Sequence, residues 1–232
     1  MKRTILIIIL ISFLVGPNIV NAEFSKFEEI NLFSKIDIIK HKIKTVLFKD
    51  DFNREDQLNL GEKWTSTSHG NWSIFNNTAR SQMPYLYFSS YAGYNNQTIK
   101  NGELHVKFKA DKIGSSESWL GIQIRTKSPG QGWWRPAGGS GYILFYGKDD
   151  NNRETLAFSN SYFKVWEKHF DNPVDWSREM GIKFQENHFT FYLDGIEQGN
   201  WTDLENNYVE GYAGMAVYNI KDVRFDDFII TS

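Results

Sequence analysis

Residues 103–110 read ELHVKFKA, and in this stretch Leu104, Val106 and Phe108 alternate with polar or charged side chains. Alternation with a period of two places the apolar residues on one face of an extended chain, so it predicts a half-buried β-strand. The same pattern recurs in WLGIQIR at 119–125. Such segments are typical of antiparallel sheets that bury one face and expose the other.

Turn signals separate segments of this kind throughout the region after residue 48. They are rich in Asn, Asp or Gly, as in KNGE at 100–103, KDDNNRE at 148–154 and QENH at 185–188. No segment of the region has the period of a long helix. The region therefore predicts an all-β fold, a two-sheet antiparallel jelly-roll sandwich.

Three further segments point to a family. They are LFKDDFNREDQLNLGEKWTSTSHGNWSIFNNTAR at 47–80, SGYILFYGKDDNNRETLAFSN at 140–160 and GYAGMAVYNIKDVRFDDFIITS at 211–232. The Asp-Asp-Phe start, the Trp-containing strand and the terminal Phe-Asp-Asp-Phe resemble concanavalin A-like lectin/glucanase jelly rolls. The resemblance covers nearly all of residues 48–232. That superfamily includes lectins, non-catalytic carbohydrate-binding modules, laminin G-like domains, glycoside hydrolases and polysaccharide lyases, so the fold does not decide between binding and catalysis.

The first 22 residues have the pattern of a secretory signal peptide. Lys2 and Arg3 form the positive start, residues 5–15 the apolar run and residues 20–22 a cleavage site. The alternative is an uncleaved anchor, but an apolar run of about eleven residues is short against the ~20 that a spanning helix needs. We expect a secreted, periplasmic or extracellular protein that does not insert into a membrane after cleavage.

The remaining chain divides at a change of pattern. In residues 23–46, Phe27, Ile30 and Phe33 recur at three-residue spacing, which predicts a linker or a short amphipathic helix. Residues 47–232 form the predicted jelly-roll domain.

Composition excludes several functions. The 232 residues carry a formal net charge of −2 without a local basic cluster, so nucleic-acid binding is not expected. The chain has no cysteine, which excludes disulfides, thiolate metal sites and a cysteine nucleophile.

Motifs for catalysis are incomplete. A retaining glycosidase needs two carboxylates about 5–5.5 Å apart, which catalytic members of the resembled superfamily supply as E-x-D-x-x-E. GELHVKFKADK at 102–112 offers only Glu103, with His105 and Lys107 where further acids would be needed. Fragments of an alginate-lyase pattern occur as QIR at 123–125 and YFKVW at 162–166, but its R-x-E-x-R string is missing.

Aromatic and polar residues gather in and after the 119–125 strand. Its outward face is expected to carry Trp119, Gln123 and Arg125, and the glycine-rich loop QGWWRPAGGSG at 131–141 follows. Aromatic faces stack on sugar rings while polar groups bind the hydroxyls, so we expect a glycan site here; the alternative is that the loop tryptophans plug the core. The predicted ligand-binding residues are Trp119, Gln123, Arg125, Trp133, Trp134, Arg135 and Tyr142.

Acidic pairs stand near both ends of the domain, at residues 50–51 and 226–227. The resemblance implies that the first and last strands are neighbours and hold a structural Ca²⁺, with Asp51 and Asp227 as candidate ligands. The alternative is that these carboxylates protect strand edges. The leading prediction for the whole chain is an exported, non-catalytic carbohydrate-binding domain. The alternatives are a polysaccharide lyase or glycoside hydrolase, and a laminin G-like module with a protein partner.

Overall fold

The computed structural model describes residues 44–67, 71–82, 89–113, 118–132, 140–149, 151, 153–171 and 175–232. Strands, turns and loops make up these residues, and the strands belong to the compact unit Thr45–Ser232. Within the described ranges no helix is long and apolar enough to cross a membrane. The expected signal peptide at 1–22 and the expected linker, up to residue 43, lie outside the described residues.

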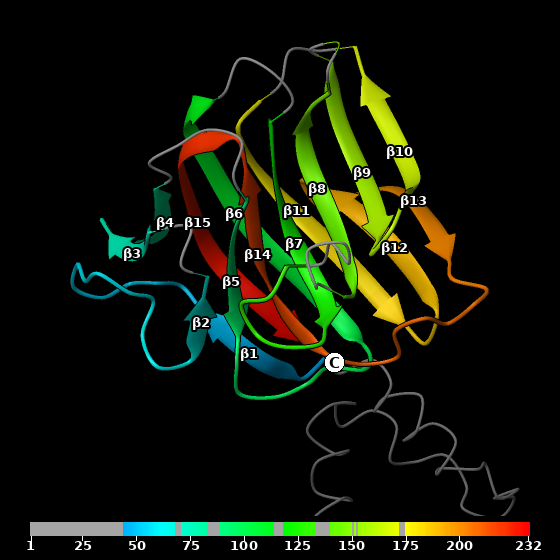
Figure 1. Ribbon diagram of the computed structural model, residues 1–232, viewed down its shortest axis with the longest axis horizontal. Coiled ribbons are helices and arrows are strands. Elements are labelled where there is room, and N and C mark those ends of the chain that lie inside the picture. The colour runs from blue at the N-terminus through cyan, green and yellow to red at the C-terminus, as the bar shows by residue number, and fades with distance from the viewer. Residues whose placement is uncertain are drawn as a thin grey trace, which may run out of the picture. The chain divides into compact units, whose positions relative to one another are not determined.

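Fifteen strands are formed by the described part of the chain (Figure 1). They are β1 (Val46–Asp50), β2 (Trp64–Ser66), β3 (Asn71–Phe75), β4 (Thr78–Gln82), β5 (Ser89–Tyr94), β6 (Gly102–Ile113), β7 (Ser118–Thr126), β8 (Tyr142–Lys148), β9 (Glu154–Asn160), β10 (Lys164–Phe170), β11 (Ser177–Gln185), β12 (His188–Leu193), β13 (Ile196–Thr202), β14 (Tyr212–Tyr218) and β15 (Ile220–Thr231).

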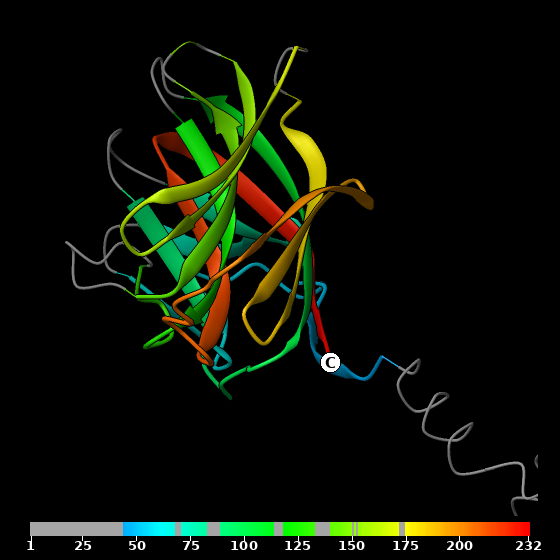
Figure 2. The ribbon, with the colours of Figure 1, turned by 90° about the vertical axis from the view of Figure 1, so that its right-hand side faces the viewer.

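The strands form two antiparallel sheets, which Figure 2 shows as two layers. The eight-stranded sheet has the order β13-β12-β11-β6-β15-β4-β3, and β1 also pairs with β15. The seven-stranded sheet has the order β10-β9-β8-β7-β14-β5-β2. Neighbours in sequence such as β6 and β7 lie in different sheets, as in a jelly roll, which confirms the predicted fold class. The first and last strands, β1 and β15, are neighbours as the resemblance implied.

The core lies between the sheets and is built by the alternation seen in the sequence. Leu104, Val106 and Phe108 of β6 are buried there. Rings from the two sheets meet directly, since Phe158 of β9 lies 4.7 Å from Phe191 of β12 between ring centroids. Burial of apolar surface, at about 25 cal/mol per Å², therefore stabilises a domain that has no disulfides.

Each sheet also has an outer face, because alternate side chains point away from the core. The outer face of the eight-stranded sheet is charged: the His105 ring lies 2.7 Å from Glu103 and 3.3 Å from Glu179. The outer face of the seven-stranded sheet carries aromatic and small residues instead, such as Trp119, Ala216 and Phe145. This second face offers a candidate binding surface.

Candidate functional site

Three neighbouring rings on the outer face of the seven-stranded sheet, Trp119, Phe145 and Tyr218, form what we call the aromatic platform. The Trp119 ring stacks on Tyr218 at 5.4 Å between centroids and lies 5.4 Å from Phe145. Trp119 is only 9% exposed, whereas Phe145 and Tyr218 are half-buried. Strand register brings them together, because Trp119 of β7 pairs with Tyr218 of β14. Gly121 pairs with Phe145, and a Cβ at Gly121 would lie 3.1 Å from the Cα of Phe145, so the close approach of β8 requires glycine here.

Polar side chains from β9 and β10 border the platform, and we call Thr155, Lys164 and Glu167 the polar rim. Together with Trp119 and Phe145 of the platform they line a small cavity, whose residues are Trp119, Phe145, Gly147, Lys148, Asp149, Thr155, Lys164 and Glu167. Lys164 Nζ donates a 2.5 Å hydrogen bond to Glu167 Oε1. Aromatic surface and hydrogen-bonding groups therefore meet at one place.

His169 contacts the polar rim and forms an ionic cluster with Glu167 and Asp149. The His169 ring lies 3.5 Å from Glu167 Oε2 and 3.7 Å from Asp149 Oδ2, and it shares a 2.9 Å hydrogen bond with Thr155. Burial raises the pKa of Asp149, but hydrogen bonds from the Arg153 backbone and guanidinium outweigh it and hold that pKa below its usual range. Asp149 is therefore a fixed negative charge at neutral pH.

Gln123, predicted as a ligand residue, lies on the same outer face, between Gly214 and Ile143 of the neighbouring strands. Its side chain is fully buried, and neither its amide oxygen nor its amide nitrogen has a hydrogen-bond partner. A buried, unpaired amide costs stability, so such a group in a folded protein needs an explanation.

Arg125 does not face outward as the alternation predicted. A β-bulge between β7 and β14, with a φ of 55° at Arg125, breaks the period of two at this residue. The guanidinium turns toward the core and donates hydrogen bonds to three carbonyls, those of Lys100, Glu186 and Tyr208. Arg125 is buried, so it ties loops together and offers no surface to a ligand.

Tyr142 is also buried in the core, where its ring stacks on Phe158 at 5.7 Å. Its hydroxyl donates a 2.5 Å hydrogen bond to Asp203 Oδ2, and the Tyr208 amide donates to the hydroxyl. Tyr142 begins β8, but the expectation that it binds ligand is corrected, because its side chain points inward. Through these two hydrogen bonds, Tyr142 holds Asp203 and Tyr208 of the loop between β13 and β14.

Trp133, Trp134 and Arg135 lie outside the described residues, and their predicted ligand role stays a prediction. The residue before them is described. A Cβ on Gly132 would lie 2.5 Å from the Tyr91 ring, so this glycine sits directly on the outer face of β5. The loop thus begins on the same face of the sheet as the aromatic platform.

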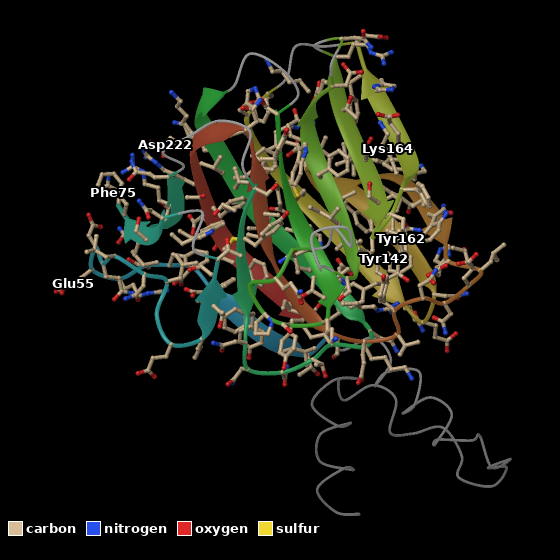
Figure 3. The ribbon with its side chains drawn as sticks, in the orientation of Figure 1. Glu55, Phe75, Tyr142, Tyr162, Lys164 and Asp222 are labelled. Atoms are coloured by element: carbon tan, nitrogen blue, oxygen red, sulfur yellow. The ribbon has the colours of Figure 1, made fainter. Side chains whose placement is uncertain are left out.

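A second, larger cavity of about 330 Å³ lies where the β9–β10 turn meets the β13–β14 loop, and we call it the end pocket. Figure 3 shows Tyr142 and Tyr162 toward this end of the sandwich. Its lining consists of Asn160, Tyr162, Phe163, Trp201, Thr202, Asp203, Leu204, Glu205 and Asn207. None of these nine residues was among the predicted site residues.

The carboxylates expected to hold Ca²⁺ are engaged in other contacts. Burial raises the pKa of Asp226, and the negative charges of Asp227 and Asp51 raise it further. Asp50 accepts hydrogen bonds from Arg54 and from the Trp64 indole, and Asp227 pairs with Lys107 at 2.8 Å. Asp51 is exposed and accepts a local backbone hydrogen bond. Within the ranges that the structure describes, no three acidic or histidine side chains gather as a metal site. The residues present do not fit a bound Ca²⁺, and none is part of the proposals below.

Comparison with known proteins identifies the fold. No protein-family model matches the chain, and no curated protein matches it in sequence. Solved structures do match. A Bacillus subtilis protein of unknown function with a galectin-like fold has a TM-score of 0.64 at 12% identity, covering 81% of this chain and 97% of that one.

Two further structures with a similar fold are a carbohydrate-binding module and a glucanase catalytic domain. The carbohydrate-binding module CBM66 from Bacillus subtilis has a TM-score of 0.57 at 15% identity, covering 73% of this chain and 96% of the module. The catalytic domain of an endo-1,3-beta-glucanase (laminarinase) from Thermotoga petrophila has a TM-score of 0.54 at 10% identity, covering 82% and 98%. These likenesses confirm the jelly-roll sandwich fold that the sequence predicted.

Proposed function

We propose that this chain is a non-catalytic carbohydrate-binding protein whose glycan lies on the outer face of the seven-stranded sheet. The observation that carries the proposal is the aromatic platform, in which the half-buried rings of Phe145 and Tyr218 flank the largely buried Trp119 beside Lys164 and Glu167 of the polar rim. Aromatic rings stack on the apolar faces of sugar rings, and charged or amide side chains bind the hydroxyls. The likeness to a carbohydrate-binding module and to a carbohydrate recognition domain supports the same ligand class.

The absence of carboxylates at the centre of this face favours binding over catalysis. The three central strands β7, β8 and β14 contain neither Asp nor Glu. A glycosidase needs a pair of carboxyl groups across the scissile bond. A sugar lying on the half-buried rings of Phe145 and Tyr218 would therefore meet aromatic surface and no general acid.

A glycoside hydrolase is the second candidate, and one arrangement favours it. Glu167 and Asp149 lie on either side of His169, at the edge of the cavity that Trp119 lines. One of the two carboxyl groups would have to hold a proton at neutral pH. The lowered pKa of Asp149 opposes this role for Asp149, and Glu167 is engaged in an ion pair with Lys164.

A glycan array probed with the full chain tests the proposal. Binding to a polysaccharide, with no reducing sugar and no unsaturated product released from it, is the expected result. Release of either product would establish the enzyme instead. Failure to bind any glycan would contradict carbohydrate binding and favour a protein-interaction module.

We also propose that residues 1–22 direct export, which would place the outer face in contact with polysaccharides outside the cytoplasm. The test is mass spectrometry of the protein secreted by its native host. The expected mature N-terminus is Glu23. A chain retained in the cytoplasm with Met1 intact would contradict export.

A further inference from the structure

The end pocket holds exposed aromatic side chains that a rigid turn keeps in place. Phe163 is 70% exposed and Tyr162 39% exposed, with ring centroids 5.9 Å apart. Asn160 Oδ1 accepts hydrogen bonds from the backbone amides of both residues, and the backbone amide of Asn160 donates a hydrogen bond to the Phe163 carbonyl. Exposure of a large apolar ring forgoes the stabilisation that its burial would give. The turn therefore presents ring surface to whatever occupies the pocket.

The opposite wall is equally well fixed. The Trp201 ring is half-buried and stacks on Phe189 of the core at 5.8 Å. The Asp203 carboxylate below it accepts hydrogen bonds from Tyr142 and from the amides of Glu205 and Asn207. A wall ordered before binding loses little conformational entropy when a ligand arrives.

Charge limits the class of ligand. Asp203 and Glu205 both line the pocket, and none of its nine lining residues is Lys, Arg or His. The same hydrogen bonds that order the loop outweigh burial and hold the pKa of Asp203 below its usual range, so it is ionised at neutral pH. The buried guanidinium of Arg125 lies close enough to Asp203 for their charges to attract, so the exposed Glu205 carboxylate supplies the negative charge that repels a uronate or another acidic sugar.

Size and chemistry together favour a saccharide over a protein partner. A volume of about 330 Å³ lies at the lower end of the ~300–1,000 Å³ of small-molecule sites. A stable protein interface needs ~800 Å² from each partner, whereas this pocket is bounded by one turn and one loop. Asn160 and Asn207 place amide groups beside the rings, a mixture that suits hydroxyl groups.

We propose that the end pocket is a second carbohydrate subsite, selective for a neutral sugar residue, that stacks its ring against Phe163 and Tyr162. The proposal rests on carbohydrate binding as the proposed function, but its location and charge selectivity are independent of the aromatic platform. Its residues share no member with the platform or the polar rim.

The test is a two-dimensional NMR titration of the isotope-labelled full chain. The neutral probes are gluco-, fructo-, galacto- and manno-oligosaccharides of four residues, and the acidic probe is tetragalacturonate. With a neutral probe, the shifts are expected at the Trp201 indole and at the side-chain amides of Asn160 and Asn207. Phe163→Ala is expected to weaken binding there at least ten-fold.

Three variants sharpen the result. Phe163→Tyr keeps a ring and is expected to stay within three-fold of the wild type. Leu58→Ala removes an apolar side chain that is 96% exposed outside the pocket, and it should leave all shifts unchanged. Glu205→Gln removes one negative charge, and it should raise affinity for tetragalacturonate about five-fold while leaving neutral probes within three-fold.

Each remaining outcome overturns a defined part of the account. Neutral probes that shift only the platform, with Phe163→Ala behaving as wild type, would overturn the end pocket and leave the proposed function standing. Tetragalacturonate binding in the end pocket as tightly as neutral probes would overturn the charge selectivity. Binding of none of the probes at either site would overturn the subsite and the proposed function together.

Discussion

The hydroxyl of Tyr142 donates a 2.5 Å hydrogen bond to the carboxylate of Asp203, and both side chains are buried. One partner begins β8 in the core, and the other begins the loop that walls the end pocket. The bond therefore joins the seven-stranded sheet to the loop between β13 and β14. Tyr142, which the sequence predicted to bind ligand, instead supports the loop that lines the proposed subsite.

Tyr142→Phe tests this support. Removal of the hydroxyl takes one donor from the buried Asp203 carboxylate, which keeps the Glu205 and Asn207 amides, and it removes the acceptor of the Tyr208 amide, so we expect a loss of about 1–3 kcal/mol in the free energy of unfolding. Urea unfolding measures it. Tyr212→Phe, a half-buried tyrosine of β14, is the control and should change stability by less than about 0.5 kcal/mol. Equal effects in the two variants would contradict the role of the bond.

Asp203 makes stability depend on pH. Its pKa is lowered in the folded state, so its contribution is present above the unfolded value of about 3.9 and is lost as pH falls through the folded value. Asp203→Asn removes this contribution. The stability difference between wild type and variant should be largest at neutral pH and should shrink below about pH 4. A difference that stays constant across that range would count against an ionised Asp203.

Arg125→Met tests the buried guanidinium. The variant leaves the carbonyls of Lys100, Glu186 and Tyr208 without their donor, and we expect a loss of about 3 kcal/mol. The control is Arg153→Met, because Arg153 is half exposed and its ion pair with Asp149 is worth at most about 1 kcal/mol. Thermal and urea unfolding compare the two. A smaller loss of unfolding free energy in Arg125→Met than in Arg153→Met would contradict the role of Arg125 in holding the three loops together.

Gln123→Met is expected to stabilise the domain. The substitution replaces two buried amide atoms that lack partners by a thioether of similar size, which should add about 1 kcal/mol to the free energy of unfolding. Gln198→Met is the control, since the Gln198 amide bonds Lys168 and the Ile196 carbonyl. A loss of stability in Gln123→Met would show that the amide has partners in solution.

The sequence was sufficient for the fold because the period of two is strong in the strands that flank the core. Leu104, Val106 and Phe108 are buried as the alternation predicted, and the pairing of β1 with β15 followed from the resemblance. The period of two predicted the wrong orientation for Arg125, because a β-bulge inserts one residue there and turns its side chain to the opposite face of the sheet. No local signal marks such an insertion, because the pairing of two distant strands decides it.

The candidate site was less predictable. Of the three rings in the aromatic platform, Trp119 was among the predicted ligand residues, whereas Phe145 and Tyr218 were not. Their strands, YILFYGK and YAGMAVY, are largely apolar on both faces, so alternation could not say which rings point outward. The end pocket combines residues about 40 positions apart in sequence, and its polar members resemble ordinary turn residues. Only tertiary structure brings Phe163 and Trp201 into one cavity.

The most direct test of glycan binding at the aromatic platform is calorimetric titration of the full chain and of Trp119→Ala with a glycan found on the array. Tyr192→Ala is the matched control, because Tyr192 is a half-buried ring on the outer face of the eight-stranded sheet. Phe145→Ala repeats the test if Trp119→Ala does not fold. The account predicts at least a ten-fold loss of affinity in the platform variants and none in the control. Unchanged affinity in folded Trp119→Ala and Phe145→Ala would contradict it.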